Sequence, residues 1–384
     1  MKRVFGSVLE YIKRLDKILL LLCIAASVFS VVLLYTLYLN NISDYVQARH
    51  YQTQIIATAM GLGAALIIAG IDYKFISKIW FVYAPVCLIF VLLLFTSLGQ
   101  GVEGADDIGW LKLGPVSFQP SELLKVAFIM TFATHLAKVG KKMNQLPHFI
   151  LLCIHGLFPT LIIAKQGDDG SALVFLFIFI AMMFAAGLSW KYILAGAASV
   201  PLIIYVMWNY AMQPHQKKRF LVLFDPEVQA SEMLGIYNQQ RLGKIALGSG
   251  QLTGKGLLGG SYTYVSEIQT DFIFSYIGMT LGFIGCVATV ALLLAICVKI
   301  LSVASGAKDQ LGKLICIGVF TVVAFHSVVN IGMVLCVVPV IGIPLPFISA
   351  GGTSVLSLYA MVGLVMSVYA HNTRKYHMFY TEKD

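Results

Sequence analysis

Long apolar runs separated by polar segments make up most of this chain. A run of about 20 apolar residues can cross the roughly 30 Å hydrocarbon core of a membrane as a helix. Such runs occur near residues 18–38, 53–71, 79–98, 122–139, 147–165, 171–188, 190–210, 272–298, 312–337 and 349–370. The pattern predicts an all-α polytopic membrane protein with about ten transmembrane helices.

Composition supports this class, because 59% of the 384 residues are hydrophobic and only 12% are charged. Two connections are long: about 99–120, which is acidic (Glu103, Asp106, Asp107), and about 211–270, between the seventh and eighth runs. In a compact membrane protein a loop as long as the second is usually functional or partly folded. We expect one membrane domain over residues 1–384.

The basic residues predict the orientation of the chain. With both termini in the cytoplasm, most of the 27 Lys and Arg residues lie inside, as the positive-inside rule requires. The net charge of +9 then reflects membrane topology. A basic stripe with interleaved aromatic residues, which would indicate nucleic-acid binding, is missing from the sequence. The loop about 211–270 is expected on the extracytoplasmic side.

Two carboxylates, Glu267 and Asp271, stand where this loop meets the eighth apolar run. A charge at a membrane boundary is costly unless it is solvated, paired or used, so it indicates a functional site. A carboxylate beside an apolar wall has a raised pKa, which suits a general base. The alternative is structural, because Thr270 and Asp271 would also form an ordinary helix start.

A basic triplet, Lys217-Lys218-Arg219, lies in the same outer loop against the general charge trend. One interpretation is an interfacial helix whose lysines reach lipid headgroups. The other is a site for a phosphorylated lipid, in which Arg219 supplies paired donors. The nearby glycines 248–260 indicate tight turns and close packing, because their spacing does not match a phosphate loop.

Two further groups of charges lie near predicted helix starts. Glu122 and Lys125 are three residues apart and share a helix face, so they are expected to pair, in a structural or gating role in preference to a catalytic one. Asp168 and Asp169 either close a turn and cap the next helix or hold a divalent cation such as Mg²⁺ or Mn²⁺.

Polar and helix-breaking residues interrupt the last two apolar segments. Interrupted helices at membrane depth normally line a cavity, because their unpaired backbone cannot face lipid. A transporter would have the same feature. His326 in the ninth run is expected to be a hydrogen-bonded packing residue. The interrupting residues are Asn330, Pro339, Pro344, Pro346, Ser349, Gly351, Gly352, Thr353 and Ser354.

Four segments, in this order, resemble the SEDS family (shape, elongation, division and sporulation): Trp110–Lys125, Gln166–Ala172, Glu267 with Thr270–Phe274, and Gly342–Ser354. The resemblance implies a ten-helix peptidoglycan glycosyltransferase of the bacterial cytoplasmic (inner) membrane, which polymerises lipid II on the outer face. It implies a class B penicillin-binding protein, a transpeptidase, as partner. Phe118 and Gly254-Lys-Gly256 look more like the elongation branch (RodA) than the division branch (FtsW).

The resemblance also assigns residues. The family's essential aspartate falls on Asp271, its buried ion pair on Glu122 and Lys125, and the acid of its Gln-Pro-Asp-Leu-Gly motif on Asp168. The chain departs from that motif, since Gly167 replaces the proline and Asp169 the leucine.

Together these residues support a mechanism. Asp271, tuned or oriented by Glu267, deprotonates the 4-hydroxyl of an acceptor sugar, which attacks the donor's anomeric carbon with inversion and releases undecaprenyl pyrophosphate. The expected substrate and pyrophosphate contacts are Arg219, Lys217, Lys218, Lys125, Glu122, Ser349, Gly351 and Gly352, with a divalent cation at Asp168. The alternatives are an FtsW-like division paralogue, a flippase or transporter of lipid-linked precursors, and a scaffold that recruits the transpeptidase.

Overall fold

The computed structural model describes residues 14–42, 46–101, 108–113, 116–233 and 235–371. The predicted cytoplasmic termini (1–13 and 372–384) and the acidic Glu103, Asp106 and Asp107 lie outside the described residues. Within the described ranges the chain is mainly helical, and each predicted apolar run contains a helix. These helices are α2 (Lys17–Leu39), α3 (Ala48–Gly70), α5 (Trp80–Leu93), α6 (Pro120–Val139), α7 (Leu146–Lys165), α8 (Asp169–Ala186), α9 (Trp190–Val206), α13 (Ile273–Ser305), α14 (Gln310–Val334) and α15 (Gly352–His371).

Nine helical segments of the described part are long and apolar enough to cross a membrane, with α6 and α9 each extended by the turn that follows it, and this confirms the all-α polytopic class. The remaining one, α5, has 14 residues and contains Pro85. At 1.5 Å per residue it is about 21 Å long, which is short of the hydrocarbon thickness. The predicted run 79–98 is therefore helical only as far as Leu93, and the short helix α4 (Tyr73–Lys78) precedes it.

Aspartates mark several helix starts. Asp16, Asp168 and Asp309 accept hydrogen bonds from the first-turn amides of α2, α8 and α14, at 3.1, 2.8 and 2.8 Å. These caps satisfy backbone donors that have no partner inside the helix. They place each helix start directly after a polar turn.

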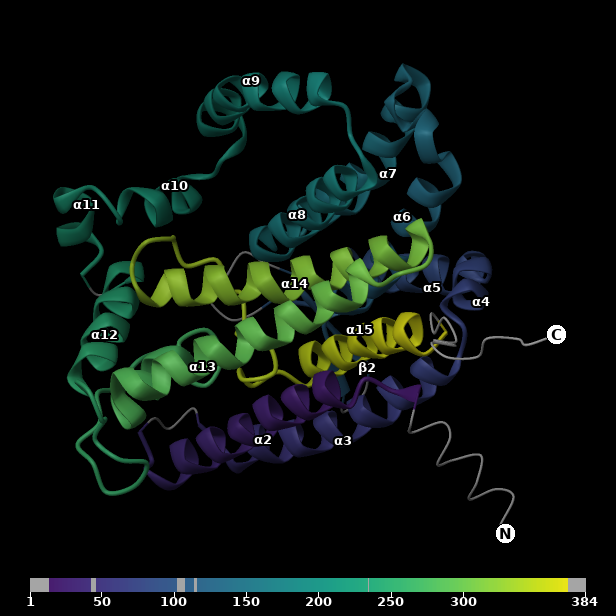
Figure 1. Cartoon of the computed structure of the whole chain (residues 1–384). Helices are drawn as coiled ribbons and strands as arrows, with labels where there is room; N and C mark the ends of the chain where they lie inside the picture. The colour runs from purple at the N-terminus through teal and green to yellow at the C-terminus, as the bar shows by residue number, and fades with distance from the viewer. Residues whose placement is uncertain (1–13, 43–45, 102–107, 114–115, 234, 372–384) are drawn as a thin grey trace, which may run out of the picture.

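The helices form a bundle in which α15 is central and α9 is peripheral (Figure 1). Most of α15 is buried, whereas α9 has no buried residue and stands apart from the rest of the bundle. Gly61 of α3 lies so close to Tyr359 of α15 that an added Cβ would come within 2.8 Å of the ring. Small residues of this kind let membrane helices approach closely.

The connection 211–270 is folded, as expected for its length. It contains α10 (Pro214–Leu221), α11 (Pro226–Ser231) and α12 (Ile236–Ser249), and α9 leads into it through a turn of π-helix, η2 (Met207–Ala211). The glycine-rich segment after α12 packs on a break in α13 at Gly282, whose φ of 67° favours glycine. In Figure 1 this connection lies at the opposite end of the bundle from α4.

The connection between α5 and α6 forms a small antiparallel sheet in the order β1 (Gly99–Gln100), β2 (Trp110–Leu113), β3 (Val116–Phe118). Gly99 pairs with Leu111, and Leu111 pairs with Phe118. The amide of Ile108 donates to the carbonyl of Gln166 at 2.9 Å, which ties this connection to the α7–α8 turn. A 3-10 turn, η1 (Gly140–Asn144), joins α6 to α7.

Candidate active site

Asp271 lies in a turn immediately before α13 and is held there through its backbone. The side-chain amide of Asn330, on α14, donates to the carbonyl of Asp271 at 2.9 Å and to that of Ile343 at 2.8 Å. Ser349 donates to the carbonyl of Thr270 at 2.5 Å, and the Ala350 amide donates to that of Gln269 at 2.9 Å. The turn at residues 267–271 is therefore joined to the loop 342–350, far away in the sequence.

The Asp271 side chain does not serve as a helix cap. The residue at the cap position of α13 is Phe272, and no side chain closes that helix start. Among the described residues, the Asp271 carboxylate accepts no hydrogen bond, and it is only partly buried. The structural alternative for Asp271 is therefore wrong, and its carboxylate is left available to a ligand.

The surroundings of Asp271 raise its pKa to about 7, mainly because burial removes water from the charged form. The negative charge of Glu267 raises the pKa further, whereas the positive charge of Arg219 lowers it. A carboxyl group with this pKa exchanges its proton near neutral pH, as a general base must.

Glu267 is exposed and has a left-handed backbone conformation, with φ of 55°. For a residue other than glycine this conformation costs on the order of 1–3 kcal/mol and persists where the surroundings hold it. Here the Glu267 carbonyl accepts from the amides of Thr270 and Phe272, both at 3.1 Å, and its carboxylate accepts from the Thr270 hydroxyl at 3.0 Å. The turn fixes Glu267 near Asp271.

The basic triplet on α10 divides into three different environments. Lys218 pairs with Glu232 at 2.7 Å, and Lys217 lies over the ring of Trp208, 5.9 Å from its centre. Arg219 is partly buried and donates to the carbonyl of Val340 at 3.4 Å. Arg219 is therefore the member of the triplet that lies toward the Asp271 turn.

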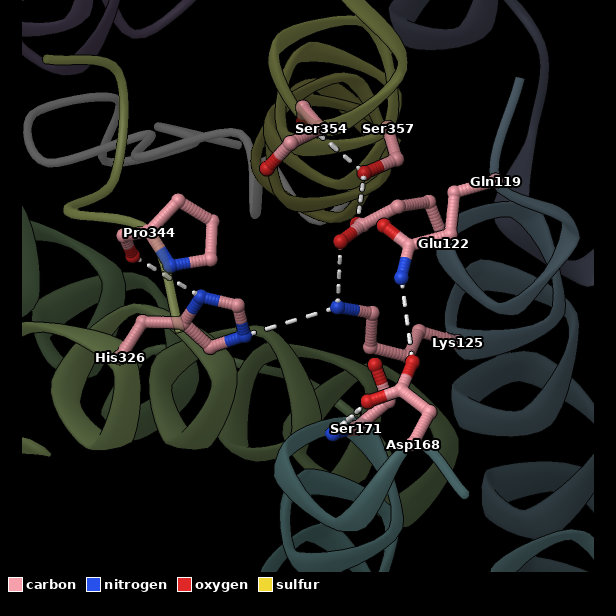
Figure 2. Close-up of polar contacts among 9 residues, drawn as sticks. All are labelled: Gln119, Glu122, Lys125, Asp168, Ser171, His326, Pro344, Ser354 and Ser357. Carbon is pink, nitrogen blue, oxygen red and sulfur yellow. Dashed lines mark hydrogen bonds and ion pairs between the residues drawn. The ribbon is translucent and has the colours of Figure 1, made fainter. Parts of the chain in front are cut away.

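A second network lies deeper in the bundle, around Glu122 and Lys125 (Figure 2). Both residues are buried and pair at 2.8 Å, as their spacing predicts. Ser357 of α15 donates to the other Glu122 oxygen at 2.8 Å. Lys125 is 3.5 Å from His326 of α14, whose other ring nitrogen is 3.3 Å from the carbonyl of Pro344. His326 is thus a hydrogen-bonded packing residue, as predicted.

Asp168 caps α8 and links it to α6. One carboxylate oxygen accepts from the Ser171 amide at 2.8 Å and the other from the Gln119 side chain at 3.0 Å (Figure 2). Asp169 accepts from Gln216 of α10 at 2.6 Å, so this acid positions the helix that carries Arg219. Within the described ranges, no group of three His, Cys, Asp or Glu side chains is arranged to hold a metal ion. These residues do not fit a resident metal, so we derive no catalytic step through one.

Gly351 and Gly352 begin α15 where it packs against α3. The Gly351 amide donates to the side chain of Gln54 at 3.3 Å, and a Cβ at Gly352 would come within 3.0 Å of Thr53. The Gln54 amide nitrogen also lies 3.3 Å from the Ser349 carbonyl. Four further side chains contact the predicted site residues and carry no role in the sequence motifs: Gln54, Gln119, Gln216 and Ser357. Their only sequence signal is a polar side chain at membrane depth or next to a charged motif.

The fold and this acidic site define a polytopic membrane protein with a candidate catalytic carboxylate at the start of a spanning helix. Comparison with known proteins identifies the family. The family model described as cell cycle protein, which covers FtsW, RodA and SpoVE, matches residues 14–374. The chain therefore belongs to the FtsW/RodA/SpoVE family, the SEDS family, as the four motifs indicated.

Curated relatives come from both branches. The peptidoglycan glycosyltransferase MrdB of Escherichia coli (strain K12) is 32% identical over 361 residues, which cover 93% of this chain and 94% of that protein. The probable peptidoglycan glycosyltransferase FtsW of Trichlorobacter lovleyi is 32% identical over 372 residues, with coverage of 92% and 93%. The two proteins, one from each branch, match this chain at equal identity.

Solved structures show the same fold. A chain from a peptidoglycan synthase complex that coordinates polymerization and crosslinking has a TM-score of 0.78 at 24% identity, and covers 94% of this chain and 99% of its own length. RodA of Thermus thermophilus has a TM-score of 0.68 at 23% identity, with coverage of 92% and 96%.

Proposed function

We propose that this protein is a peptidoglycan glycosyltransferase that polymerises lipid II into glycan strands on the outer face of the bacterial cytoplasmic membrane. The observation that carries the proposal is the Asp271 carboxylate, which is partly buried, free of hydrogen bonds from the described residues and titrates near neutral pH. Membership of the family and the names of the relatives support the same activity.

In the proposed reaction, Asp271 accepts the proton of the acceptor sugar's 4-hydroxyl. The freed oxygen electron pair attacks the anomeric carbon of the donor from the side opposite the leaving group, so that the configuration inverts. The bond from that carbon to the lipid diphosphate breaks, and its electron pair goes to the departing phosphate oxygen. General base catalysis by a positioned carboxylate contributes on the order of 10²- to 10⁴-fold.

Arg219 is the cation that we assign to the leaving diphosphate. Its guanidinium lies near Asp271 and is not held by a carboxylate within hydrogen-bond distance among the described residues, whereas Lys218 is paired with Glu232. A guanidinium matches phosphate oxygens in a bidentate geometry. Lys217 and Lys218 then serve mainly to fix α10 at the membrane surface.

The sequence predicts substrate contacts for Ser349, Gly351 and Gly352, and we assign to all three the positioning of the backbone around the site. Ser349 positions Thr270 and therefore Asp271, while the two glycines allow α15 to approach α3. We assign to Glu122 and Lys125 the role of a buried polar link between α6, α14 and α15. This is the structural or gating role predicted for them, and their predicted contact with substrate stays a prediction.

A divalent cation remains part of the proposal as a requirement of the substrate diphosphate. Mg²⁺ is usually bound through one or two carboxylates together with substrate phosphates. Such a cation would supply positive charge to the departing diphosphate. The described residues do not form a cage for it, so the chain's own contribution to that charge is Arg219.

The proposed setting is cell elongation, with a class B penicillin-binding protein as the partner that crosslinks the new strands. The proposed topology has both termini in the cytoplasm and the Asp271 turn outside, which follows from the distribution of basic residues. The similar fold within a peptidoglycan synthase complex supports such a partner.

The test is polymerisation by the purified full-length protein, with and without its transpeptidase, supplied with lipid II and Mg²⁺ in lipid vesicles. We expect glycan strands that a muramidase digests. A flippase would move labelled lipid II between leaflets without forming strands. Absence of strands in both preparations, from protein with an intact thermal transition, would refute the activity.

A further inference from the structure

A cavity outside the candidate active site lies between α5, α6 and α7 and has a volume of about 530 Å³. Apolar side chains form most of its wall, and none of the residues that line it is acidic. The lining extends along α6 from Leu124 to Lys138, which at 1.5 Å per residue is roughly 21 Å. That length accommodates one acyl chain of a bilayer leaflet, which spans roughly 15 Å.

The polar side chains of this cavity lie in the half toward the end of α6, and its charged side chain, Lys138, lies at that end. Lys138, near the end of α6, is exposed and has no ion-pair partner among the described residues. His135 lies one turn earlier on the same helix and also lines the cavity. The cationic or titratable groups that face His135 are Lys138, His148 and His155. The cavity is therefore an apolar channel with an uncompensated positive end.

Hydrogen bonding leaves one nitrogen of His135 available. The Nδ1 atoms of His135 and His155 are 3.0 Å apart, so one ring must donate and the other accept. His155 Nε2 is 3.3 Å from the Thr131 hydroxyl, which also donates to the carbonyl of Phe128 at 3.2 Å. This chain ends at His135 Nε2, which has no partner among the described residues. Because the Thr131 hydrogen is on the Phe128 carbonyl, His155 Nε2–H donates to Thr131 and His135 Nδ1–H donates to His155. His135 then donates from Nε2 to a ligand phosphate oxygen beside Lys138 when its ring is protonated, a form that a bound anion favours.

We propose that this cavity binds one anionic phospholipid, with an acyl chain between α5, α6 and α7 and the headgroup phosphate at Lys138 and His135. The spanning helices α6 and α7 place the apolar part of the cavity at hydrocarbon depth, where a lipid tail is its natural occupant. The positive end, without a carboxylate, selects a negatively charged headgroup. Lys138 lies at the end of α6 remote from Glu122, so the lipid comes from the leaflet opposite the Asp271 site.

The test is photolabelling of the full-length protein in nanodiscs by phosphatidylglycerol or phosphatidylcholine with a diazirine on the acyl chain. We expect phosphatidylglycerol to label segments 80–88, 124–138 and 155–159 in preference to other lipid-facing surfaces. Lys138→Gln should lower the ratio of phosphatidylglycerol to phosphatidylcholine labelling about fivefold. The matched control, Lys142→Gln, removes an exposed charge outside the cavity and should leave the ratio unchanged.

Two cavity-filling variants, Ala84→Trp on α5 and Ala127→Phe on α6, should each abolish labelling of these segments while phosphatidylglycerol labelling elsewhere persists. The two substitutions lie on different helices, so that one variant still tests the site if the other fails to fold. Thermal unfolding checks the folding of each variant. Labelling spread evenly over all lipid-facing helices, or equal for both lipids and unchanged in Lys138→Gln, would refute the site. Displacement of the label by undecaprenyl phosphate, but not by unlabelled phosphatidylglycerol, would also refute the site.

Discussion

The Asn330 side chain contacts the backbone carbonyl of Asp271 and not the Asp271 carboxylate. The Asn330 amide bridges the carbonyls of Asp271 and Ile343 at 2.9 and 2.8 Å, and so joins the turn before α13 to the loop before α15. Because its carboxylate is not used in this contact, Asp271 is positioned while its acid function stays available. A buried asparagine in an apolar helix is thus explained by the site that it orients.

Replacing Asn330 by alanine should therefore impair positioning. Asn330→Ala leaves two carbonyls without this donor, at a cost of about 1–3 kcal/mol each where they are buried. We expect a lower thermal transition and a kcat reduced at least tenfold, with a smaller change in KM. Ser327→Ala is the matched control, because Ser327 donates only to Val323 within the same helix. Equal kcat in Asn330→Ala and the control would contradict this role.

The pH dependence of polymerisation should report the ionisation of Asp271. Below a pKa of about 7 the carboxyl is protonated and cannot accept a proton, so kcat/KM should rise with pH through that value. Glu267→Gln removes a charge that raises the pKa, so the midpoint should move to lower pH. Arg219→Gln removes a charge that lowers it, so the midpoint should move to higher pH. Midpoints that stay fixed, or both move in one direction, would contradict the assignment.

The buried Glu122–Lys125 pair should be sensitive to the loss of one member. Lys125→Met leaves the Glu122 charge in the bundle interior without its cation, which is expected to cost about 3–5 kcal/mol. The double variant Glu122→Gln/Lys125→Met removes both charges and should be more stable than Lys125→Met alone. A double-mutant cycle of unfolding free energies measures this coupling, and additive effects would show that the pair contributes nothing.

The cation requirement can be separated from Asp168. Chelation should reduce polymerisation, and Mg²⁺ or Mn²⁺ should restore it. Because both Asp168 oxygens accept protein hydrogen bonds, Asp168→Asn should lower thermal stability, typically by about 1 kcal/mol for a lost cap, without changing the Mg²⁺ concentration for half-maximal activity. A raised Mg²⁺ requirement in Asp168→Asn would instead show that Asp168 is a ligand of the cation.

The sequence predicts the parts of this fold that are set by local pattern. Apolar runs predict the spans, and the three-residue spacing predicts the Glu122–Lys125 pair, because both depend on neighbours within one helix. The run 79–98 follows this prediction only in part, because helix α5 ends at Leu93.

The contacts between distant segments could not be predicted in this way. Ser357 meets Glu122 across 235 positions, and Asn330 meets Asp271 across 59. No periodicity encodes which helices become neighbours. The ion pair between Lys218 and Glu232 is another contact of this kind, because it forms only when the segment after α10 folds.

Asp271→Asn tests most directly whether Asp271 is the base, because the change keeps the shape of the side chain and removes its basicity. Strand formation from lipid II by the folded variant, assembled with its transpeptidase, should fall at least 100-fold. Glu227→Gln, an exposed acid on α11, should polymerise at the normal rate. A normal rate in Asp271→Asn would contradict the mechanism.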